Sequence, residues 1–343
     1  MNRKNILYFN IASDINNVSL GFVMDWIREF SKSFESIDVI SLNKSEITPF
    51  TRNVKVYGIN KKNKLNKFLK IRKITRNLVS QKNYELSFFH MTPLLLITTW
   101  DILKKNNINS ILWYTHPKPK SILDKLTLRL ATLLSNQLVT ASSSSFPYNT
   151  KKLKVVGHGI NYENFFNIKN SLQNKNFLIL SRISMSKNIE YSINEFLNSS
   201  FKNEMLTVIG SPLTKQDAIY FEKLKLEFCN NLNIKFKEKI PHNQLAEELQ
   251  NYSFHINATE QGFYDKTVLE TMAAGLINFY ANQDYDQHFE NVLTRFNPIK
   301  GGLTNCLNEI YKLEETELIK IIIYNQKSIK NESINSIVSR ILN

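Results

Sequence analysis

The feature that most constrains the fold of this chain is an alternation of short apolar runs with longer segments of helical spacing. Runs rich in β-branched and aromatic residues recur at 5–12, 38–42, 54–59, 86–91, 110–116 and 137–142, and again at 176–181, 204–210, 234–240, 254–259 and 276–281. Strands that alternate with helices form βαβ units and parallel sheets. Two such series predict an α/β chain with two doubly wound, Rossmann-like domains.

The chain length agrees with this division. A chain of 343 residues exceeds the size at which a single core stops growing, about 250–300 residues. The stretch 157–166, GHGINYENFF, carries two glycines between the two series and is the expected joint. We expect one domain over 1–160 and a second over 161–343, with the option that the last helices pack back on the first. Ligands of doubly wound sheets bind at the carboxyl ends of strands, so the two sheets should face a central cleft that holds the active site.

Several classes of protein lose support from missing motifs. The first strand is not followed by GxGxxG, and the chain contains no GxxxxGK[ST], which argues against a dinucleotide oxidoreductase and a P-loop NTPase.

Two cysteines, Cys229 and Cys306, make neither a disulfide framework nor a metal cluster and indicate a reducing compartment. The N-terminus lacks the pattern of a signal peptide, and the apolar run at 93–100 is far shorter than the roughly 20 residues of a membrane span. We therefore expect a cytoplasmic protein, either free or bound peripherally to the inner face of the cell membrane.

The positive charge is confined to the first half of the chain. Residues 1–165 hold 25 Lys/Arg and 10 Asp/Glu, whereas residues 166–343 hold 19 and 20. Within the first half, residues 60–83 hold nine basic residues and no acidic one, and their spacing predicts a basic amphipathic helix. Two interpretations stay open: a surface helix whose apolar side lies on the core, or a helix that binds an anionic membrane, where each cation is worth roughly 1 kcal/mol. Nucleic acid is not expected as a partner, because no aromatic stacking platform or zinc spacing accompanies the charge.

Two cations follow the first strand of the second series, in the loop 181-SRISMSKN-188. Arg182 and Lys187 precede a helix that should begin near Asn188. Cations at a strand end beside a helix N-terminus can bind a diphosphate, Arg through its planar fork and Lys as a point charge. The alternative is that both are ordinary solvated cations.

A second loop, 258-ATEQGFYDKTVLETMAAG-275, leads into a helix predicted over 266–274. The free N–H groups at the start of that helix can bind a phosphate or a sugar hydroxyl, and Asp265 is the expected N-cap. Glu270 lies about one turn in, where a carboxylate can accept two hydrogen bonds from a ribose diol. The alternative for Glu270 is an ion pair with Lys266, which would run in the weaker order with the cation first.

Both loops resemble those of the retaining nucleotide-sugar glycosyltransferases of the GT-B fold. In that family the first strand of the C-terminal domain is followed by G-R-[IL]-S-x-x-K-[NG], which the S-R-I-S-M-S-K-N of 181–188 resembles. The family's E-G-F-x-x-x-x-L-E-A-M-A-x-G, with its E-x7-E spacing, resembles the GFYDKTVLETMAAG of 262–275. The ordered resemblance extends over about residues 155–281.

The resemblance implies a retaining hexosyltransferase that uses a nucleoside-diphosphate sugar and needs no cofactor or metal. The family's Arg and Lys bind the donor diphosphate, and its closing Glu binds the ribose, which implies those roles for Arg182, Lys187 and Glu270. The expected donor-binding residues are Arg182, Lys187, Gly262, Phe263, Asp265, Lys266, Thr267 and Glu270, and the expected catalytic residues are His116, Arg182 and Lys187. The acceptor should be a glycan or a lipid-linked sugar of cell-envelope polysaccharide or lipopolysaccharide synthesis.

The chain departs from the family at one position. The first Glu of E-x7-E would lie eight residues before Glu270, and that position is Gly262. Glu260 and Asp265 are the candidates to contact the sugar in its place. Two alternatives stay open: a nucleotide-sugar epimerase or hydrolase of the same fold, and a non-catalytic nucleotide-sugar-binding partner, which the departure at Gly262 supports.

Three residues of the first half are expected near the donor sugar. His90 and His116 each follow a predicted strand, and the resemblance suggests that a His after the later strand contacts the sugar or its leaving phosphate. That selects His116, with Lys118 and Lys120 nearby, and leaves His90 as the second candidate. Either histidine could instead be a core residue. Gly21, in the loop after the first strand, is a candidate for close backbone approach to a ligand.

Overall fold

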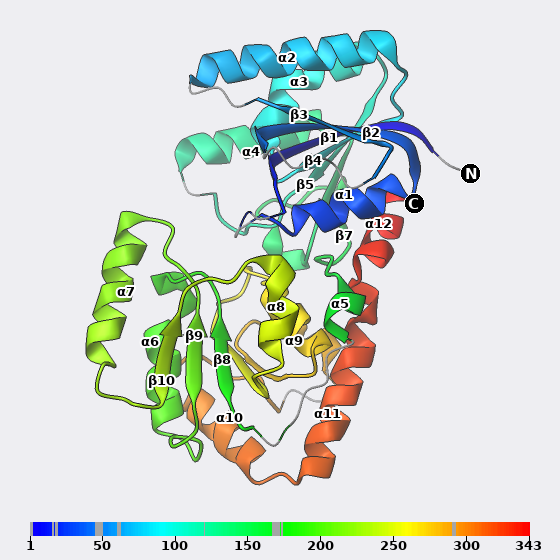
Figure 1. Cartoon of the computed structure of the whole chain (residues 1–343). Helices are drawn as coiled ribbons and strands as arrows, with labels where there is room; N and C mark the ends of the chain where they lie inside the picture. The colour runs from blue at the N-terminus through cyan, green and yellow to red at the C-terminus, as the bar shows by residue number, and fades with distance from the viewer. Residues whose placement is uncertain are drawn as a thin grey trace. The chain divides into compact units, whose positions relative to one another are not determined.

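The computed structural model describes residues 3–15, 17, 20–44, 51–59, 63–119, 121–166, 172, 174–289 and 293–343. The chain divides into two compact units (Figure 1). Unit 1 comprises Met1–Gly159 and Ile334–Asn343, and unit 2 comprises Ile160–Ser333. The division lies within the stretch GHGINYENFF, and the last helix of the chain belongs to unit 1.

Unit 1 is built on a parallel sheet of seven strands in the order β3-β2-β1-β4-β5-β6-β7. The strands are β1 (Arg3–Ser13), β2 (Phe34–Lys44), β3 (Val54–Gly58), β4 (Leu86–His90), β5 (Asn109–Trp113), β6 (Gln137–Thr140) and β7 (Leu153–Val155). The helices are α1 (Val23–Ser31), α2 (Lys64–Gln81), α3 (Pro93–Lys105), α4 (Ile122–Leu134) and α12 (Ile334–Leu342). The strand order reverses between β1 and β4, which is the topological switch point of a doubly wound sheet.

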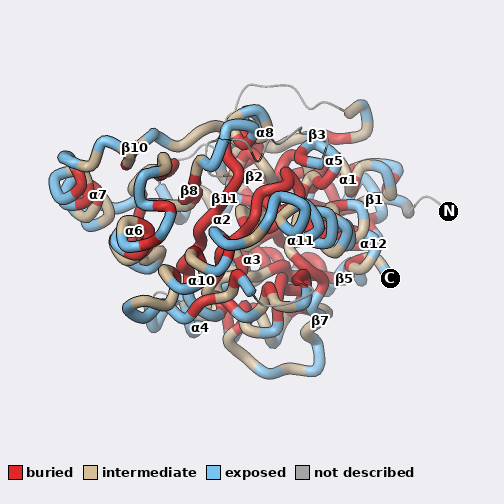
Figure 2. The backbone as a smooth tube through the Cα atoms, turned by 90° about the horizontal axis from the view of Figure 1, so that it is seen from below, coloured by how far each residue is buried: buried red, intermediate tan, exposed pale blue. Residues whose placement is uncertain are grey.

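The two faces of this sheet are covered by different helices. Successive residues of β1 point to opposite faces: Leu7 and Phe9 belong to the core that α2, α3 and α4 cover, whereas the Tyr8 ring contacts Phe30 of α1 at 5.7 Å between centroids. α12 packs beside α1. Figure 2 shows the consequence, because central strands such as β4 and β5 are largely buried while the outer sides of the helices are exposed.

Unit 2 is built on a parallel sheet of five strands in the order β10-β9-β8-β11-β12. The strands are β8 (Phe177–Leu180), β9 (Leu206–Ile209), β10 (Ile234–Lys237), β11 (Phe254–Asn257) and β12 (Ile277–Tyr280). The helices are α5 (Tyr162–Phe166), α6 (Ile189–Leu197), α7 (Lys215–Glu227), α8 (His242–Leu249), α9 (Lys266–Ala273), α10 (Gly302–Tyr311) and α11 (Glu315–Ser328). The predicted α/β class with parallel sheets is confirmed.

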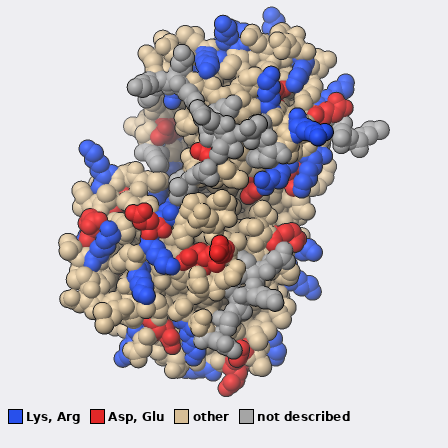
Figure 3. Space-filling model, viewed as in Figure 1, with Lys and Arg blue, Asp and Glu red and all other residues tan. Residues whose placement is uncertain are grey.

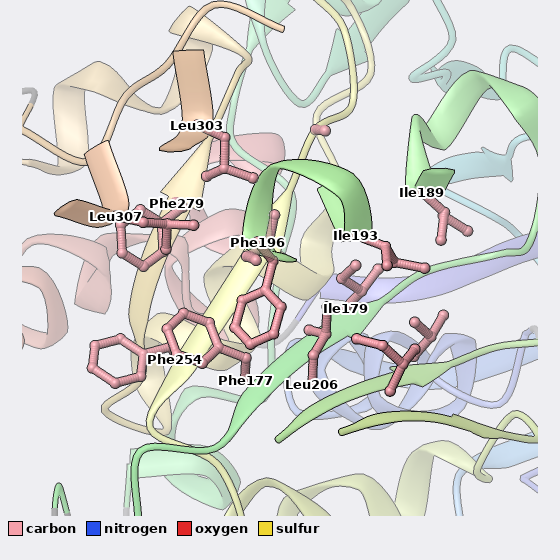
Figure 4. Packing of buried hydrophobic residues seen from close by; sticks show 14 of the residues in the cluster. Phe177, Ile179, Ile189, Ile193, Phe196, Leu206, Phe254, Phe279, Leu303 and Leu307 are labelled. Carbon is pink, nitrogen blue, oxygen red and sulfur yellow. The ribbon is translucent and has the colours of Figure 1, made fainter. Parts of the chain in front are cut away.

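Aromatic packing fixes the strands of unit 2 (Figure 4). Phe177 of β8 stacks on Phe254 of β11 at 4.5 Å between centroids and contacts Phe196 of α6 at 5.0 Å. All three rings are fully or almost fully buried, and burying a Phe side chain stabilises a fold by about 1.5–3 kcal/mol. The loops at the carboxyl ends of these strands are therefore carried by a rigid base.

The basic helix predicted over 60–83 is α2, and residues 60–62 lie outside the described part of the chain. Ile71 and Leu78 are buried against the core of unit 1. Arg72 forms an ion pair with Asp101 at 2.6 Å. The larger apolar residues in the middle of α2 thus face the core, as in the first of the two interpretations. Among the described helices, none is long and apolar enough to cross a membrane.

Candidate functional site

The residues that follow β8 and β9 lie very close together in unit 2. Gly210 follows β9, and a Cβ atom at that position would lie 2.0 Å from the carbonyl oxygen of Ser181, which follows β8. Any larger residue would push the loop 181–188 away from the sheet. Ile183 is fully buried and its N–H donates to the carbonyl of Ser211 at 3.2 Å. The loop is therefore held in place on both sides of Arg182.

The side chain of Arg182 has a buried hydrogen-bond donor that the described residues leave unsatisfied. Its Nε is buried and has no hydrogen-bond partner among the residues that the structure describes. An unsatisfied buried donor costs roughly 1–3 kcal/mol. An acceptor such as a phosphate oxygen would satisfy it, and the guanidinium fork is well suited to that group.

Lys187, in contrast, is paired with a carboxylate. Its Nζ lies 2.5 Å from Oδ2 of Asp265 and 3.4 Å from the hydroxyl of Thr259. The same oxygen of Asp265 accepts hydrogen bonds from Thr259 at 2.9 Å and from Asn257 at 3.3 Å. Burial raises the pKa of Asp265, but the Lys187 ammonium and these hydrogen bonds outweigh it and hold the pKa below its usual range. Asp265 therefore stays ionised.

The predicted cap at Asp265 needs a correction. Asp265 does occupy the N-cap position of α9, but its side chain makes no capping hydrogen bond to that helix. The carboxylate instead binds the ammonium of Lys187, which comes from the loop after β8, together with the side chains of Thr259 and Asn257. Gly275 has φ +83 and follows α9, as a helix-terminating glycine does.

Glu270 is the most buried carboxylate of the site, with 1% of its surface exposed. Its Oε1 lies 2.7 Å from Nε2 of His242 and 2.8 Å from Nζ of Lys266. Its Oε2 is buried and has no hydrogen-bond partner within the described chain. Burial raises the pKa of Glu270, but the charges of Lys266 and His242 outweigh burial and lower it to about 2. The ion pair with Lys266 forms, and one oxygen of the same carboxylate still lacks a donor.

Lys239 adds a further cation that the sequence analysis missed. Burial lowers its pKa, and the positive charges of Lys266 and Arg182 lower it further, while Glu270 acts in the opposite direction. Lys239 therefore lies within electrostatic reach of two other cations, Arg182 and Lys266, and of the buried Glu270. The surplus of positive charge suits an anionic ligand. The available signal was strand length: β10 ends at Lys237, so Lys239 lies in the loop after a strand and not in the strand that was predicted to run to residue 240, and His242 is the first residue of α8.

The loop between β11 and α9 relies on backbone geometry at Gly262, whose φ is +93. Residues other than glycine rarely adopt that conformation. The carbonyl of Phe263 accepts from Asn282 at 3.1 Å, and the carbonyl of Asp265 accepts from the Tyr285 hydroxyl at 2.9 Å. These bonds fix the backbone on the C-terminal side of Gly262.

The remaining residues of this loop are placed differently from one another. Glu260 is exposed. The ring of Phe263 lies 5.9 Å from Nζ of Lys187. Thr267, in the first turn of α9, has a buried hydroxyl without a partner among the described residues. Lys187, Asp265 and Phe263 are thus brought together, whereas Glu260 turns toward solvent.

His90 is the last residue of β4 and not part of a loop. It is 4% exposed, and its Nδ1 lies 2.6 Å from the hydroxyl of Tyr8. Its ring is 5.1 Å from Trp26 and 6.3 Å from Trp113, centroid to centroid. Burial and the nearby His158 lower the pKa of His90 to about 3. The structure therefore places a neutral histidine in the aromatic core of unit 1.

His116 and Gly21 lie in loops of unit 1. β5 ends at Trp113 and not at residue 116, so His116 lies in the following loop, where it is exposed and its ring is 5.9 Å from that of Tyr114. Lys118 is exposed in the same loop, and Lys120 lies outside the described residues. At Gly21, a Cβ would lie 2.7 Å from the carbonyl oxygen of Ile15. The close approach at Gly21 is thus to the backbone of its own loop.

No group of three or more His, Cys, Asp or Glu residues that could hold a metal ion occurs within the described ranges. Cys229 is an exposed free thiol and Cys306 a partly buried one.

Solved structures share this architecture at low sequence identity. The chain is similar to Anabaena Alr3699/HepE in complex with UDP and glucose, with 13% identity, a TM-score of 0.75 and 98% of each chain covered. It is similar to sucrose-phosphate synthase from Thermosynechococcus elongatus, with 12% identity, a TM-score of 0.74, and 99% of this chain and 98% of that chain covered. The lipopolysaccharide outer core galactosyltransferase WaaB has 12% identity, a TM-score of 0.64, and 98% of this chain and 99% of that chain covered. No protein-family model matches the sequence, and no curated protein does.

These likenesses, all below 15% identity, establish the fold. The chain has the GT-B fold, and the predicted fold class is confirmed.

Proposed function

We propose that this protein is a glycosyltransferase that moves a hexose-type sugar from a nucleoside-diphosphate sugar to a glycan or lipid-linked acceptor, with retention of configuration. The observation that carries the proposal is the polar cluster of unit 2, where the buried Glu270 binds Lys266 and His242 through one oxygen and Lys239 lies within electrostatic reach of Glu270, Lys266 and Arg182. HepE, which shares the fold, has been solved with UDP and with UDP-glucose. That supports a uridine diphosphate sugar as the first donor to test.

The unpartnered atoms of the cluster define how the donor would bind. The Nε of Arg182 has no acceptor and would donate to the diphosphate. The free Oε2 of Glu270 would accept from a ribose hydroxyl, while its Oε1 stays bound to Lys266 and His242. When the bond between sugar and phosphate breaks, negative charge grows on the leaving diphosphate. Cations already held in place stabilise that charge without reorganisation.

Lys187 would contribute through its remaining donor. An ammonium group has three N–H donors. Asp265 and Thr259 account for two of them, and the third is available to a donor phosphate. Asp265 would then orient Lys187, and we assign it that role in addition to the sugar contact expected from its position.

Two of the proposed sugar contacts, Glu260 and His116, are exposed side chains. Glu260 and His116 are exposed in loops that follow strands, so either can reach a ligand. His90 is a weaker candidate because its Nδ1 is already engaged by Tyr8 in the core. Gly21, with Phe263 and Thr267, remains a candidate for contact with the donor.

The acceptor is proposed to belong to cell-envelope polysaccharide or lipopolysaccharide synthesis, with the protein on the inner face of the membrane. The excess of basic residues in the first half supports attachment to anionic lipid. Figure 3 shows basic side chains over the edge of unit 1 where α2 lies.

Calorimetry with UDP-glucose tests the donor site directly. We expect Arg182→Gln and Glu270→Gln each to weaken binding by about tenfold or more, because each removes a hydrogen bond that involves a charged group. Glu190→Gln is the matched control, since Glu190 pairs with Lys223 on an exposed surface of the same unit. Binding that is unchanged in both site variants, for UDP-glucose and for other nucleotide sugars, would contradict the assignment.

Gly262 favours a second candidate function, a hydrolase or epimerase of this fold or a non-catalytic nucleotide-sugar-binding partner. The first carboxylate of the E-x7-E pattern is absent there, and φ of +93 disfavours any side chain. Analysis of products with water as the only acceptor separates these functions. Sugar release without an acceptor indicates a hydrolase, a new sugar epimer indicates an epimerase, and donor binding with no turnover under any acceptor indicates a binding partner.

A further inference from the structure

α4 carries more exposed apolar surface than a solvated helix normally does. Its exposed aliphatic side chains have between 44% and 80% of their surface accessible and are Ile122, Leu123, Leu126, Leu130 and Leu133. Its inner side is formed by Leu128 and Ala131, which are almost fully buried. α4 is therefore apolar on two sides, and only one of them is accounted for by the core of unit 1.

The exposed residues form a continuous stripe along the helix. Ile122, Leu126, Leu130 and Leu133 are separated by four, four and three positions, which places them on successive turns of one side. A stripe of this kind is typical of a surface that is covered by something other than water.

The stripe is flanked by cations. Lys125 and Arg129 are exposed, and neither forms a salt bridge within the described part of the chain; the guanidinium of Arg129 lies 5.5 Å from the centre of the Tyr148 ring. The acidic residue of this helix, Asp124, accepts a hydrogen bond from the hydroxyl of Ser121 at 2.8 Å at the helix start. The outward side of α4 is thus apolar and cationic together.

Hydrogen bonds from neighbouring side chains of unit 1 hold α4 in place. Lys152 donates to the carbonyls of Leu133 and Ser135, both at 2.8 Å, and so binds the end of the helix. The hydroxyl of Tyr148 donates to the carbonyl of Lys125 at 3.1 Å. The stripe is therefore presented as a rigid surface, with no folding step required on binding.

We propose that the outward side of α4 docks on an anionic lipid bilayer, with the stripe in the boundary between headgroups and acyl chains and with Lys125 and Arg129 at the lipid phosphates. Charge complementarity favours this occupant, because apolar residues flanked by unpaired cations match the surface of such a bilayer. A second copy of this chain would bring Lys125 and Arg129 toward like charges. The proposal rests on the membrane association proposed above and assigns it to α4.

α2 is the natural comparison, because it is the more basic helix. Lys70 donates to the carbonyl of Gly58 and Arg72 pairs with Asp101, so part of its charge serves the fold. Its exposed large apolar side chains are Leu65 and Leu69, near its start. α2 therefore offers charge and little apolar surface, and α4 offers both.

Cosedimentation of the full chain with vesicles tests the proposal. We expect binding to vesicles of phosphatidylcholine mixed with phosphatidylglycerol, and much weaker binding to phosphatidylcholine alone. Leu126→Gln/Leu133→Gln should weaken binding about a hundredfold, since each leucine that loses an apolar environment costs about tenfold. Leu65→Gln/Leu69→Gln on α2 is the matched control and should change binding by less than about threefold. Both pairs lie on exposed helix surfaces, so unchanged circular dichroism and melting temperature are expected.

The proposal is overturned if the α4 pair binds as well as the wild type, or if the α2 pair loses more. Equal binding to both kinds of vesicle would remove the role of anionic lipid. Sedimentation equilibrium identifies the rival occupant: a dimer that Leu126→Gln/Leu133→Gln converts to a monomer, without lipid binding, would assign the stripe to a second copy. Calorimetry with UDP-glucose on the same variants keeps the two proposals apart, because the α4 pair leaves the donor site intact.

Discussion

The end of β4 in unit 1 holds a histidine that burial keeps neutral, whereas α9 of unit 2 holds carboxylates, at its N-cap and within the helix, that neighbouring cations keep ionised. His90, at the end of β4, lies among aromatic rings and has a pKa lowered to about 3. Glu270 is as deeply buried, yet its pKa is lowered to about 2 by Lys266 and His242, against the effect of burial. The end of β4 in unit 1 thus holds a packing residue, whereas the helix that follows β11 in unit 2 holds an ion-paired carboxylate.

The largest expected effect comes from the aromatic core of unit 1. Gly159 has φ +80, and a Cβ there would lie 2.6 Å from the Trp26 ring. We expect Gly159→Ala to destabilise unit 1 by about 4 kcal/mol, from backbone strain together with overpacking. Urea unfolding followed by tryptophan fluorescence reports this unit, because all three tryptophans of the chain, Trp26, Trp100 and Trp113, belong to it.

Gly301→Ala is the control that separates strain from overpacking. Gly301 has φ +81 but nothing within 4 Å of its would-be Cβ. It should cost only the strain, about 1–2 kcal/mol. Because Gly301 belongs to unit 2, its cost is measured by hydrogen exchange on peptides of α10 and not by tryptophan fluorescence. A cost at Gly159 no greater than the cost at Gly301 would show that Trp26 yields easily and that the aromatic core is not rigid.

A smaller loss of stability is expected when the ion pair between Lys187 and Asp265 in unit 2 is broken. Lys187→Met leaves the Asp265 carboxylate without its cation, and we expect unit 2 to lose about 3 kcal/mol of stability, because removing one partner of a buried pair leaves an uncompensated charge. The double variant Lys187→Met/Asp265→Asn should recover part of that loss. Hydrogen exchange measured by mass spectrometry on peptides of α9 follows unit 2 specifically. Additive losses in the double variant would mean that the pair contributes no coupling energy.

The smallest effect concerns the pH dependence of unit 1. The pKa of His90 is about 3 in the folded state and 6.5 as its ordinary value, so the unfolded state binds one more proton between those values. Stability therefore falls as pH falls through 6.5, and His90 accounts for a loss of about 2 kcal/mol between pH 7 and pH 5. Tryptophan-monitored urea unfolding at both pH values checks this. His90→Gln, which keeps a polar partner for Tyr8, should remove that part of the pH dependence, and an unchanged pH dependence in this variant would place the titration elsewhere.

The pKa of Glu270 is lowered, whereas burial alone would raise the pKa of a carboxyl group. Its folded pKa of about 2 lies below its ordinary value of 4.5. The stabilisation it provides is present above pH 4.5 and is lost as pH falls toward 2. The pH window from 7 to 5 therefore reports His90 without interference from Glu270.

The loops that carry the candidate site could be predicted because they follow strands. Apolar runs located β8 and β11, and the residues after them include Arg182, Lys187 and Glu270. Lys239 could not be identified in the same way, because the predicted strand at 234–240 extended over it, whereas β10 ends at Lys237. His242 begins α8, and its partner Glu270 lies 28 positions away along the chain. Strand boundaries depend on sheet partners, and these come from elsewhere in the chain.

By itself, the sequence determined the α/β class, the two series of strands and the loops in which cations and carboxylates occur. Those properties follow from periodicities of two and 3.6 residues, which are local. Only the tertiary structure decided that Lys187 pairs with Asp265, 78 positions away, that Glu270 binds His242 and Lys266 through a single oxygen, and that His90 lies in the core. Partners of buried charges are chosen by which strand ends become neighbours, and the order of strands in a sheet is not written in the periodicity of any one segment.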